Sequence, residues 1–219
     1  MARLVCLANS HKLGQRCIAG KLTDTGRWVR PVSALEHGEI AWHVRAVDGR
    51  DPRVLDILDI PLQASGPDYG CQPENRLLAP GRWRMAGRLP RSDVIKYVDA
   101  DGGPKLFYNY VDSVPLTLFR RVPAAAWRSL QLILCDYVHF HPDPRRTADW
   151  RATFRYREIQ YSNLKVTDPA AEARLNRRER LDGPCALTIS LGMPFRPAGS
   201  ARSRCYKLVA AVMRLDDAD

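Results

Sequence analysis

Short apolar segments separated by turn residues recur along the chain and predict a structure built mainly of β-strands. Residues 4–8, 16–22 and 28–32 are rich in β-branched, aromatic and other apolar side chains. Residues 54–62 place Asp between Leu and Ile, which is typical of a half-buried strand. The polar residues 9–14 between the first two segments are expected to form a loop.

A second block of strand-like segments follows in the C-terminal half. The strands predicted there are residues 130–140, 153–157, 159–166, 187–191 and 206–215. Pro142 and Pro144 predict a loop over residues 141–149. Asp168 followed by Pro169 is a typical helix start, so we expect a short helix over residues 170–176.

The region between the blocks is less regular. Weaker strand predictions are residues 82–86, 107–110 and 116–119, and residues 123–127 are expected to form a helical turn. Two strand blocks of this size favour a mainly β fold, with two small β-barrels in tandem and short helices. We place the first barrel at residues 1–110 and the second at residues 111–219.

The charge of the chain favours a polyanionic partner. The sequence has 34 Lys and Arg against 24 Asp and Glu, a net charge of +10. Residues 145–207 alone hold 14 basic and 6 acidic residues. Of the basic residues 28 are Arg, whose planar guanidinium pairs with phosphate and stacks on bases. A genome rich in G and C would also raise the Arg content, but it would do so evenly along the chain.

We therefore predict a nucleic-acid or nucleotide site made of cations and aromatic rings. Its candidate residues are Lys12, Arg16, Trp28, Arg30, Arg155, Tyr156, Arg157, Arg177, Arg178, Arg202, Arg204 and Lys207. In the leading interpretation the arginines line one groove across both barrels, and Trp28 and Tyr156 stack on bases. The alternative is a nucleotide or modified-base sensor, in which a closed pocket contains Lys12, Arg16, Arg30 and Lys207. A solvated strand face would show a similar pattern.

Several other classes of protein find no support in the sequence. The P-loop, the G-x-G-x-x-G run and the G-x-S-x-G elbow are absent, so we expect a protein that is not an enzyme and has no cofactor. Six scattered cysteines lack zinc-ligand spacing, and no metal is predicted. The longest apolar run, residues 208–213, is too short to span a bilayer. Without an export signal, we expect reduced thiols and a cytoplasmic location.

One short peptide suggests a protein partner. Leu116, Leu118 and Phe119 resemble the Leu-x-Leu-Phe end of peptides that bind the bacterial sliding clamp, although the leading Gln is missing. Leu and Phe alternating in a strand are also ordinary core residues. The interpretation as a docking segment requires Leu118 and Phe119 to be exposed.

Taken in order, six motifs resemble the dual OB-containing domain, a family of small bacterial proteins. They are residues 7–20, 28–33, 72–75, Tyr161 with 167–169, 189–192 and 206–212. The resemblance implies two OB-like barrels, nucleic-acid or nucleotide binding, and a link to bacterial conflict systems. A toxin-like interaction module, as in toxin–antitoxin or defence systems, is a further alternative. The chain departs from the pattern at Gln15, where a second Gly is expected, and at Cys205, where a His is expected.

Overall fold

The computed structural model of the protein describes residues 1–100, 103–119, 121–123 and 126–217, and over these ranges the strands form two six-stranded sheets. The helices are few and short. The predicted mainly β fold is confirmed. Among the described residues, no helix has the length and apolar character needed to cross a membrane.

Each sheet belongs to one of two compact units. The first unit comprises Met1–Pro67 and Glu74–Tyr97, and the second comprises Asp68–Pro73 and Val98–Asp217. Residues 98–110 therefore group with the second sheet, because side chains of this segment are buried in its core. The predicted limit at residue 110, taken as the end of an independently folding domain, stays a prediction.

The first unit is a small barrel-like sheet with strand order β5-β3-β2-β1-β4-β6. Its elements are β1 (Ala2–Lys12), β2 (Gln15–Leu22), β3 (Trp28–Val32), α1 (Trp42–Arg45), β4 (Asp56–Ile60), β5 (Asn75–Leu77), β6 (Arg84–Arg88) and the 3₁₀ helix η1 (Arg91–Tyr97). β5 runs parallel to β3, and β6 runs antiparallel to β4. β5 and β6 together thus occupy the place of one interrupted fifth strand.

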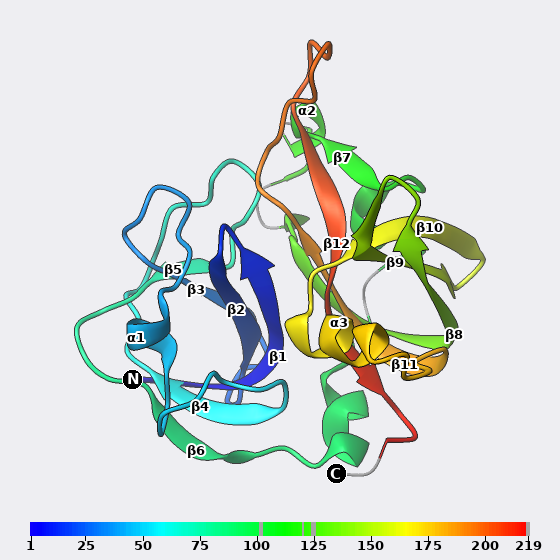
Figure 1. Cartoon of the computed structure of the whole chain (residues 1–219). Coiled ribbons are helices and arrows are strands. Elements are labelled where there is room, and N and C mark those ends of the chain that lie inside the picture. The colour runs from blue at the N-terminus through cyan, green and yellow to red at the C-terminus, as the bar shows by residue number, and fades with distance from the viewer. Residues whose placement is uncertain (101–102, 120, 124–125, 218–219) are drawn as a thin grey trace. The chain divides into compact units, whose positions relative to one another are not determined.

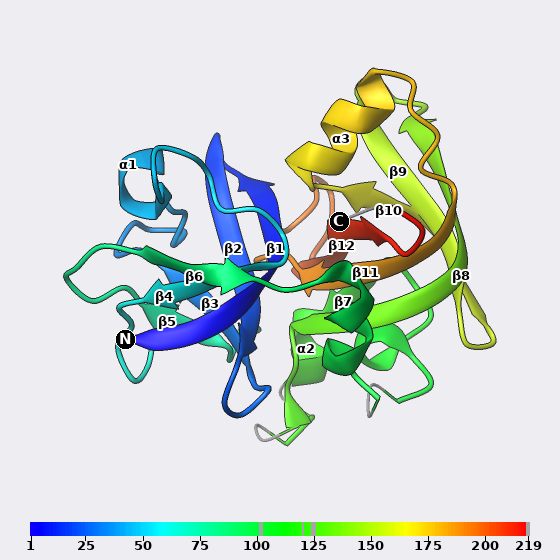
Figure 2. The same ribbon diagram turned by 90° about the horizontal axis from the view of Figure 1, so that it is seen from below.

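The second unit is a closed five-stranded barrel with one added strand (Figures 1 and 2). Its elements are η2 (Leu106–Tyr108), β7 (Ser113–Pro115), α2 (Leu116–Phe119), β8 (Leu130–Asp143), β9 (Arg146–Tyr156), β10 (Ile159–Val166), α3 (Pro169–Asn176), β11 (Gly183–Leu191) and β12 (Arg204–Arg214). The sheet order is β10-β9-β8-β11-β12-β7, and a parallel pairing of β10 with β12 closes the barrel.

The two units share one connectivity. In each, three antiparallel strands are followed by a short helix and a fourth strand. The fifth strand pairs with both the third and the fourth, and in the first unit it is divided into β5, beside the third, and β6, beside the fourth. A five-stranded Greek-key barrel of this kind is the OB-fold. The predicted tandem OB-like barrels are therefore confirmed.

Turn residues set the ends of the strands in both units. Leu13 and Gly14 adopt φ of 48° and 74°, so the first hairpin has a two-residue turn. The loop predicted at residues 9–14 is therefore mostly wrong, since β1 continues to Lys12. Buried Asn9 donates its side-chain N–H to the carbonyl of Pro52 at 2.7 Å, which accounts for a polar residue inside the strand.

Other sequence predictions fail where local polarity is a poor guide to pairing. The predicted loop 141–149 is mostly strand, because β8 and β9 leave only a tight turn in which Asp143 accepts the backbone N–H of Arg145. Residues 107–110 and 116–119 are not strands, since they contribute to η2 and α2. The helix expected at 170–176 is confirmed as α3. The helical turn expected at 123–127 includes residues outside the described ranges.

Candidate nucleic-acid interface

Five of the 14 cations in residues 145–207 are paired with carboxylates of the described residues. Arg155 bonds Glu158 at 2.7 Å, and Arg177 bonds Glu179 at 2.7 Å. Further pairs are Arg151 with Asp143, Lys165 with Asp149, and Arg174 with Glu179 and Asp217. Because a carboxylate lies beside each of these five cations, they attract phosphate less than the composition of residues 145–207 suggests.

The remaining predicted arginines of the second unit lie in different surroundings. Arg157 donates to the Ala100 carbonyl at 3.2 Å and lies 5.5 Å from the Tyr156 ring. Arg204 is half-buried and donates to the Ser113 hydroxyl at 3.3 Å. Arg178 and Arg202 are exposed.

In the first unit, Lys12, Arg16 and Trp28 are half-buried. Arg16 contacts His11 at 2.6 Å and lies 3.7 Å from a carboxylate oxygen of Asp51. The ammonium of Lys21 lies 5.4 Å from the centre of the Trp28 ring. These residues place the Lys21 ammonium beside the Trp28 ring, but the charge of Arg16 is partly neutralised by Asp51.

Three predicted contact residues are buried, and these predictions are wrong. Arg30 has no exposed surface and donates to the Asn75 side-chain oxygen at 3.2 Å, so it connects β3 with β5. Tyr156 is 6% exposed and lies in the second core, so it cannot stack on a base. Lys207 is 1% exposed. Because Arg30 and Lys207 bond within their own units, neither can line the pocket that the sensor alternative assigned to them.

The prediction that residues 116–119 form an exposed clamp-binding segment is also wrong. Leu116, Leu118 and Phe119 form the short helix α2 instead of an extended peptide. Phe119 is 1% exposed and packs edge-on against Tyr108 and Trp127. Leu116 and Leu118 pack on the same core. A partner cannot reach Phe119 without unfolding this part of the barrel.

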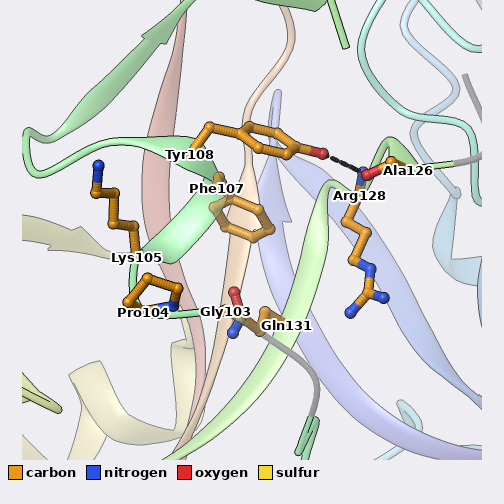
Figure 3. A pocket seen from close by; sticks show the side chains of 8 residues that line it. All are labelled: Gly103, Pro104, Lys105, Phe107, Tyr108, Ala126, Arg128 and Gln131. Atoms are coloured by element: carbon orange, nitrogen blue, oxygen red, sulfur yellow. Dashed lines mark hydrogen bonds between the residues drawn. The ribbon is translucent and has the colours of Figure 1, made fainter. Parts of the chain in front are cut away.

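Two hollows in the second unit share the side chain of Tyr108. The Phe107 pocket, of about 350 Å³, is lined among others by Lys105, Phe107, Tyr108, Ala126, Arg128 and Gln131 (Figure 3). The Arg202 pocket, also of about 350 Å³, is lined among others by Tyr108, Asn109, Pro115, Leu118, Arg121 and Arg202. Volumes of this size suit a small ligand or part of a larger one.

The two pockets together present four cations and no carboxylate among their described lining residues. Arg121, Arg128 and Arg202 are exposed, and Lys105 is half-buried with its ammonium 4.1 Å from the centre of the Tyr110 ring. None of the four forms an ion pair with any other residue that the structure describes. Unlike Arg155 and Arg177, these four cations are available to an anion.

The backbone between the pockets is strained and firmly held. Phe107 and Tyr108 adopt φ of 43° and 77°, a region that bulky side chains rarely enter. The Tyr108 hydroxyl donates to the Ala126 carbonyl at 2.8 Å and accepts the Arg128 backbone N–H at 2.9 Å. The Tyr161 hydroxyl accepts the Leu106 backbone N–H at 2.8 Å. These bonds fix the Tyr108 side chain and the backbone on the N-terminal side of Phe107 before any ligand arrives.

Comparison with known families agrees with this architecture. The dual OB-containing domain matches residues 2–212, nearly the whole chain. The chain belongs to this family. No curated protein and no solved structure matches it. The family and the fold together support nucleic-acid or nucleotide binding as a general class of function.

Within this dual OB protein, Lys207 forms hydrogen bonds to Asn109, one of the residues that line the Arg202 pocket. Its ammonium donates to the backbone oxygen of Asn109 at 2.9 Å and to the side-chain oxygen at 2.8 Å, and it lies 4.7 Å from the centre of the Tyr161 ring. Burial lowers the pKa of Lys207 to about 7, while Asp112 opposes this shift. Lys207 thus supports the segment that carries Tyr108 and Asn109.

The low pKa of Lys207 predicts a pH-dependent stability. Between about pH 7 and 8.5 the unfolded chain keeps the Lys207 proton that the folded protein has lost, so the free energy of unfolding should rise with pH, by up to about 1 kcal/mol per unit. The window stops there because burial raises the pKa of the Cys135 and Cys185 thiols, which reverses the slope at higher pH. Urea unfolding at several pH values measures the slope. Lys207→Met should remove it, and equal slopes in both proteins would contradict the prediction.

Of the four pocket cations, only Arg202 was predicted from the sequence, and the aromatic residues of the pockets were missed, although a local signal was present. Residues 105–110 place one cation, Lys105, before three aromatic residues, Phe107, Tyr108 and Tyr110. The prediction followed the excess of basic residues in 145–207, and the region around residues 105–110 has only a small net charge. Arg121, Arg128 and Arg202 join these residues only through the fold, as the pocket linings show.

Proposed function

We propose that the protein binds single-stranded nucleic acid through the Phe107 and Arg202 pockets of its second barrel. The observation that carries the proposal is the set of four available cations around the shared ring of Tyr108. In ordinary OB-folds the loop between the fourth and fifth strands takes part in oligonucleotide binding. Here that loop joins β11 to β12 and contributes Arg202.

The cations supply the affinity for the strand backbone. Guanidinium groups bind phosphate through paired hydrogen bonds, and each neutralised phosphate releases counterions. Arg121 and Arg202 line one pocket, and Arg128 with Lys105 lines the other. Binding should therefore weaken steeply as the salt concentration increases.

The aromatic rings favour unpaired bases. Tyr108 lines both pockets, and Tyr110 is 58% exposed beside Lys105. In a duplex the base faces are stacked and cannot reach such rings, whereas single strands can lay their bases on them. We therefore assign single-stranded DNA or RNA as the ligand and expect duplexes of equal length to bind more weakly.

Two finer hypotheses from the sequence stay predictions. One is that a basic groove continues over the first barrel through Lys12, Arg16 and Trp28. The other is a role in a bacterial conflict or defence system, which comes from the family resemblance.

The test compares two double variants with equal loss of charge. Arg121→Ala with Arg202→Ala should weaken binding of a fluorescent single strand about tenfold, because it removes two unpaired cations from the Arg202 pocket. Fluorescence anisotropy at several salt concentrations measures the affinity and its salt slope.

Arg155→Ala with Arg177→Ala is the matched control. Both arginines are exposed on the same unit but are paired with glutamates. The control should bind within about twofold of the unaltered protein. Equal losses in the two double variants, or no binding by the unaltered protein, would overturn the proposal.

A further inference from the structure

The Phe107 pocket has features that strand binding alone does not require. Its lining includes the half-buried ring of Tyr108 and the ring of Phe107, which is 3% exposed. The amide of Gln131 lies beneath them and donates to the Tyr156 hydroxyl at 3.2 Å. Figure 3 shows the Phe107 ring between the Lys105 and Arg128 side chains. The pocket thus combines an aromatic surface with two flanking cations.

We propose that this pocket takes a single unstacked nucleobase whose attached phosphate is held by Arg128. This inference rests on the proposed function and names the part of the ligand that the pocket recognises. A base is a flat ring that packs on the half-buried ring of Tyr108, and its phosphate then lies within reach of the exposed Arg128. An acidic peptide would match the cations but would leave the aromatic surface unused.

The pocket is shaped for a rigid ligand before binding. The left-handed backbone at Phe107 and Tyr108 costs free energy, and it is kept by the bonds from the Tyr108 hydroxyl to Ala126 and Arg128. A site that is already ordered loses little conformational entropy when it binds. Such a site favours one flat group over a flexible chain.

A strand and a free nucleotide carry the same recognised group, so the experiment has one arm for each. The first arm measures the affinity for a thymidine strand of about 16 nucleotides and for an abasic strand of equal length and charge. The ratio of the two affinities gives the contribution of the bases to binding. Because every base of the thymidine strand is the same, this holds wherever along the strand the protein binds. In the second arm, adenosine 5′-monophosphate and thymidine 5′-monophosphate are each titrated into the protein, and calorimetry measures the affinity.

Ala126→Phe is the pocket-filling variant, because Ala126 is exposed at the pocket and its backbone contact with Tyr108 is kept. It should lower the ratio about tenfold and leave the affinity for the abasic strand unchanged. Ala173→Phe, on the exposed side of α3, is the matched control and should change neither value. Should Ala126→Phe fail to fold, Arg128→Ala replaces it and should weaken nucleotide or strand binding about tenfold.

The outcomes separate this inference from the proposed function. A lowered ratio supports a base from a strand, and nucleotide binding that is lost in Ala126→Phe supports a free nucleotide. If strands bind but the ratio changes less than about twofold and no nucleotide binds, the pocket inference is overturned while strand binding stands. If strands fail to bind but a nucleotide does, only the proposed function is overturned.

Discussion

Replacing Gly20 with alanine is expected to destabilise the first barrel by about 3 kcal/mol. Gly20 lies in β2 and pairs with Cys6 of β1 and Val29 of β3. A Cβ atom at Gly20 would lie 2.0 Å from the backbone oxygen of Val5, a distance that atoms cannot share. Because the obstacle is backbone in a central strand, no rotamer change relieves it, and both ladders must shift.

Gly14→Ala is the control for this prediction. Gly14 has φ of 74° but nothing within 4 Å of an added Cβ, so its replacement should cost only the strain of the left-handed backbone, about 1 kcal/mol. Urea unfolding gives the two free energies, and hydrogen exchange read by mass spectrometry assigns the loss to β1, β2 and β3. Equal costs at Gly20 and Gly14 would show that close approach of the strands is not what requires Gly20.

Asp168→Ala should destabilise the second barrel by a similar amount, about 3 kcal/mol. The Asp168 carboxylate is 2% exposed and accepts the backbone N–H groups of Ala170 at 2.9 Å, Ala171 at 3.3 Å and Val212 at 2.9 Å. The first two bonds cap α3, and the third attaches the helix start to β12. Removing the carboxylate leaves these buried donors without their acceptor, and such donors cost more than the bonds alone.

Asp168→Asn separates the two parts of this effect. An asparagine keeps one oxygen, which can still cap α3, and its amide group cannot accept the Val212 N–H. It should therefore cost about half as much as Asp168→Ala. Unfolding free energies provide the comparison, and faster hydrogen exchange in both α3 and β12 is expected for alanine. An exchange increase confined to α3 would contradict a role in attaching the helix to the strand.

The fold was largely readable from local patterns. Alternating apolar residues and turn residues indicate strands because pleating sends successive side chains to opposite faces. The predicted segment 28–32 coincides with β3, and Asp168 with Pro169 marks the start of α3. The errors lie at Pro142, inside β8, and at residues 116–119, where a few apolar residues suit a strand and a helical turn equally well.

The site was less readable, because exposure depends on contacts between distant residues. Arg30 has the same chemistry as Arg202, yet Arg30 is buried against Asn75 and Arg202 lies at a pocket. Arg174 is paired with Asp217, which is 43 positions away. A count of charges along the chain contains no such information.

Local sequence was therefore enough for the strand blocks, the helix start, the basic character and the family, since each depends on neighbouring residues or on ordered motifs. The choice of which cations face an anion came only from folding. The Phe107 and Arg202 pockets bring Arg202 together with residues of 103–118, with Arg121 and with residues of 126–131. Arg155 and Arg177, which were also predicted to meet phosphate, are paired with glutamates. Burial and ion pairing are set by distances in space, and spacing along the chain does not encode them.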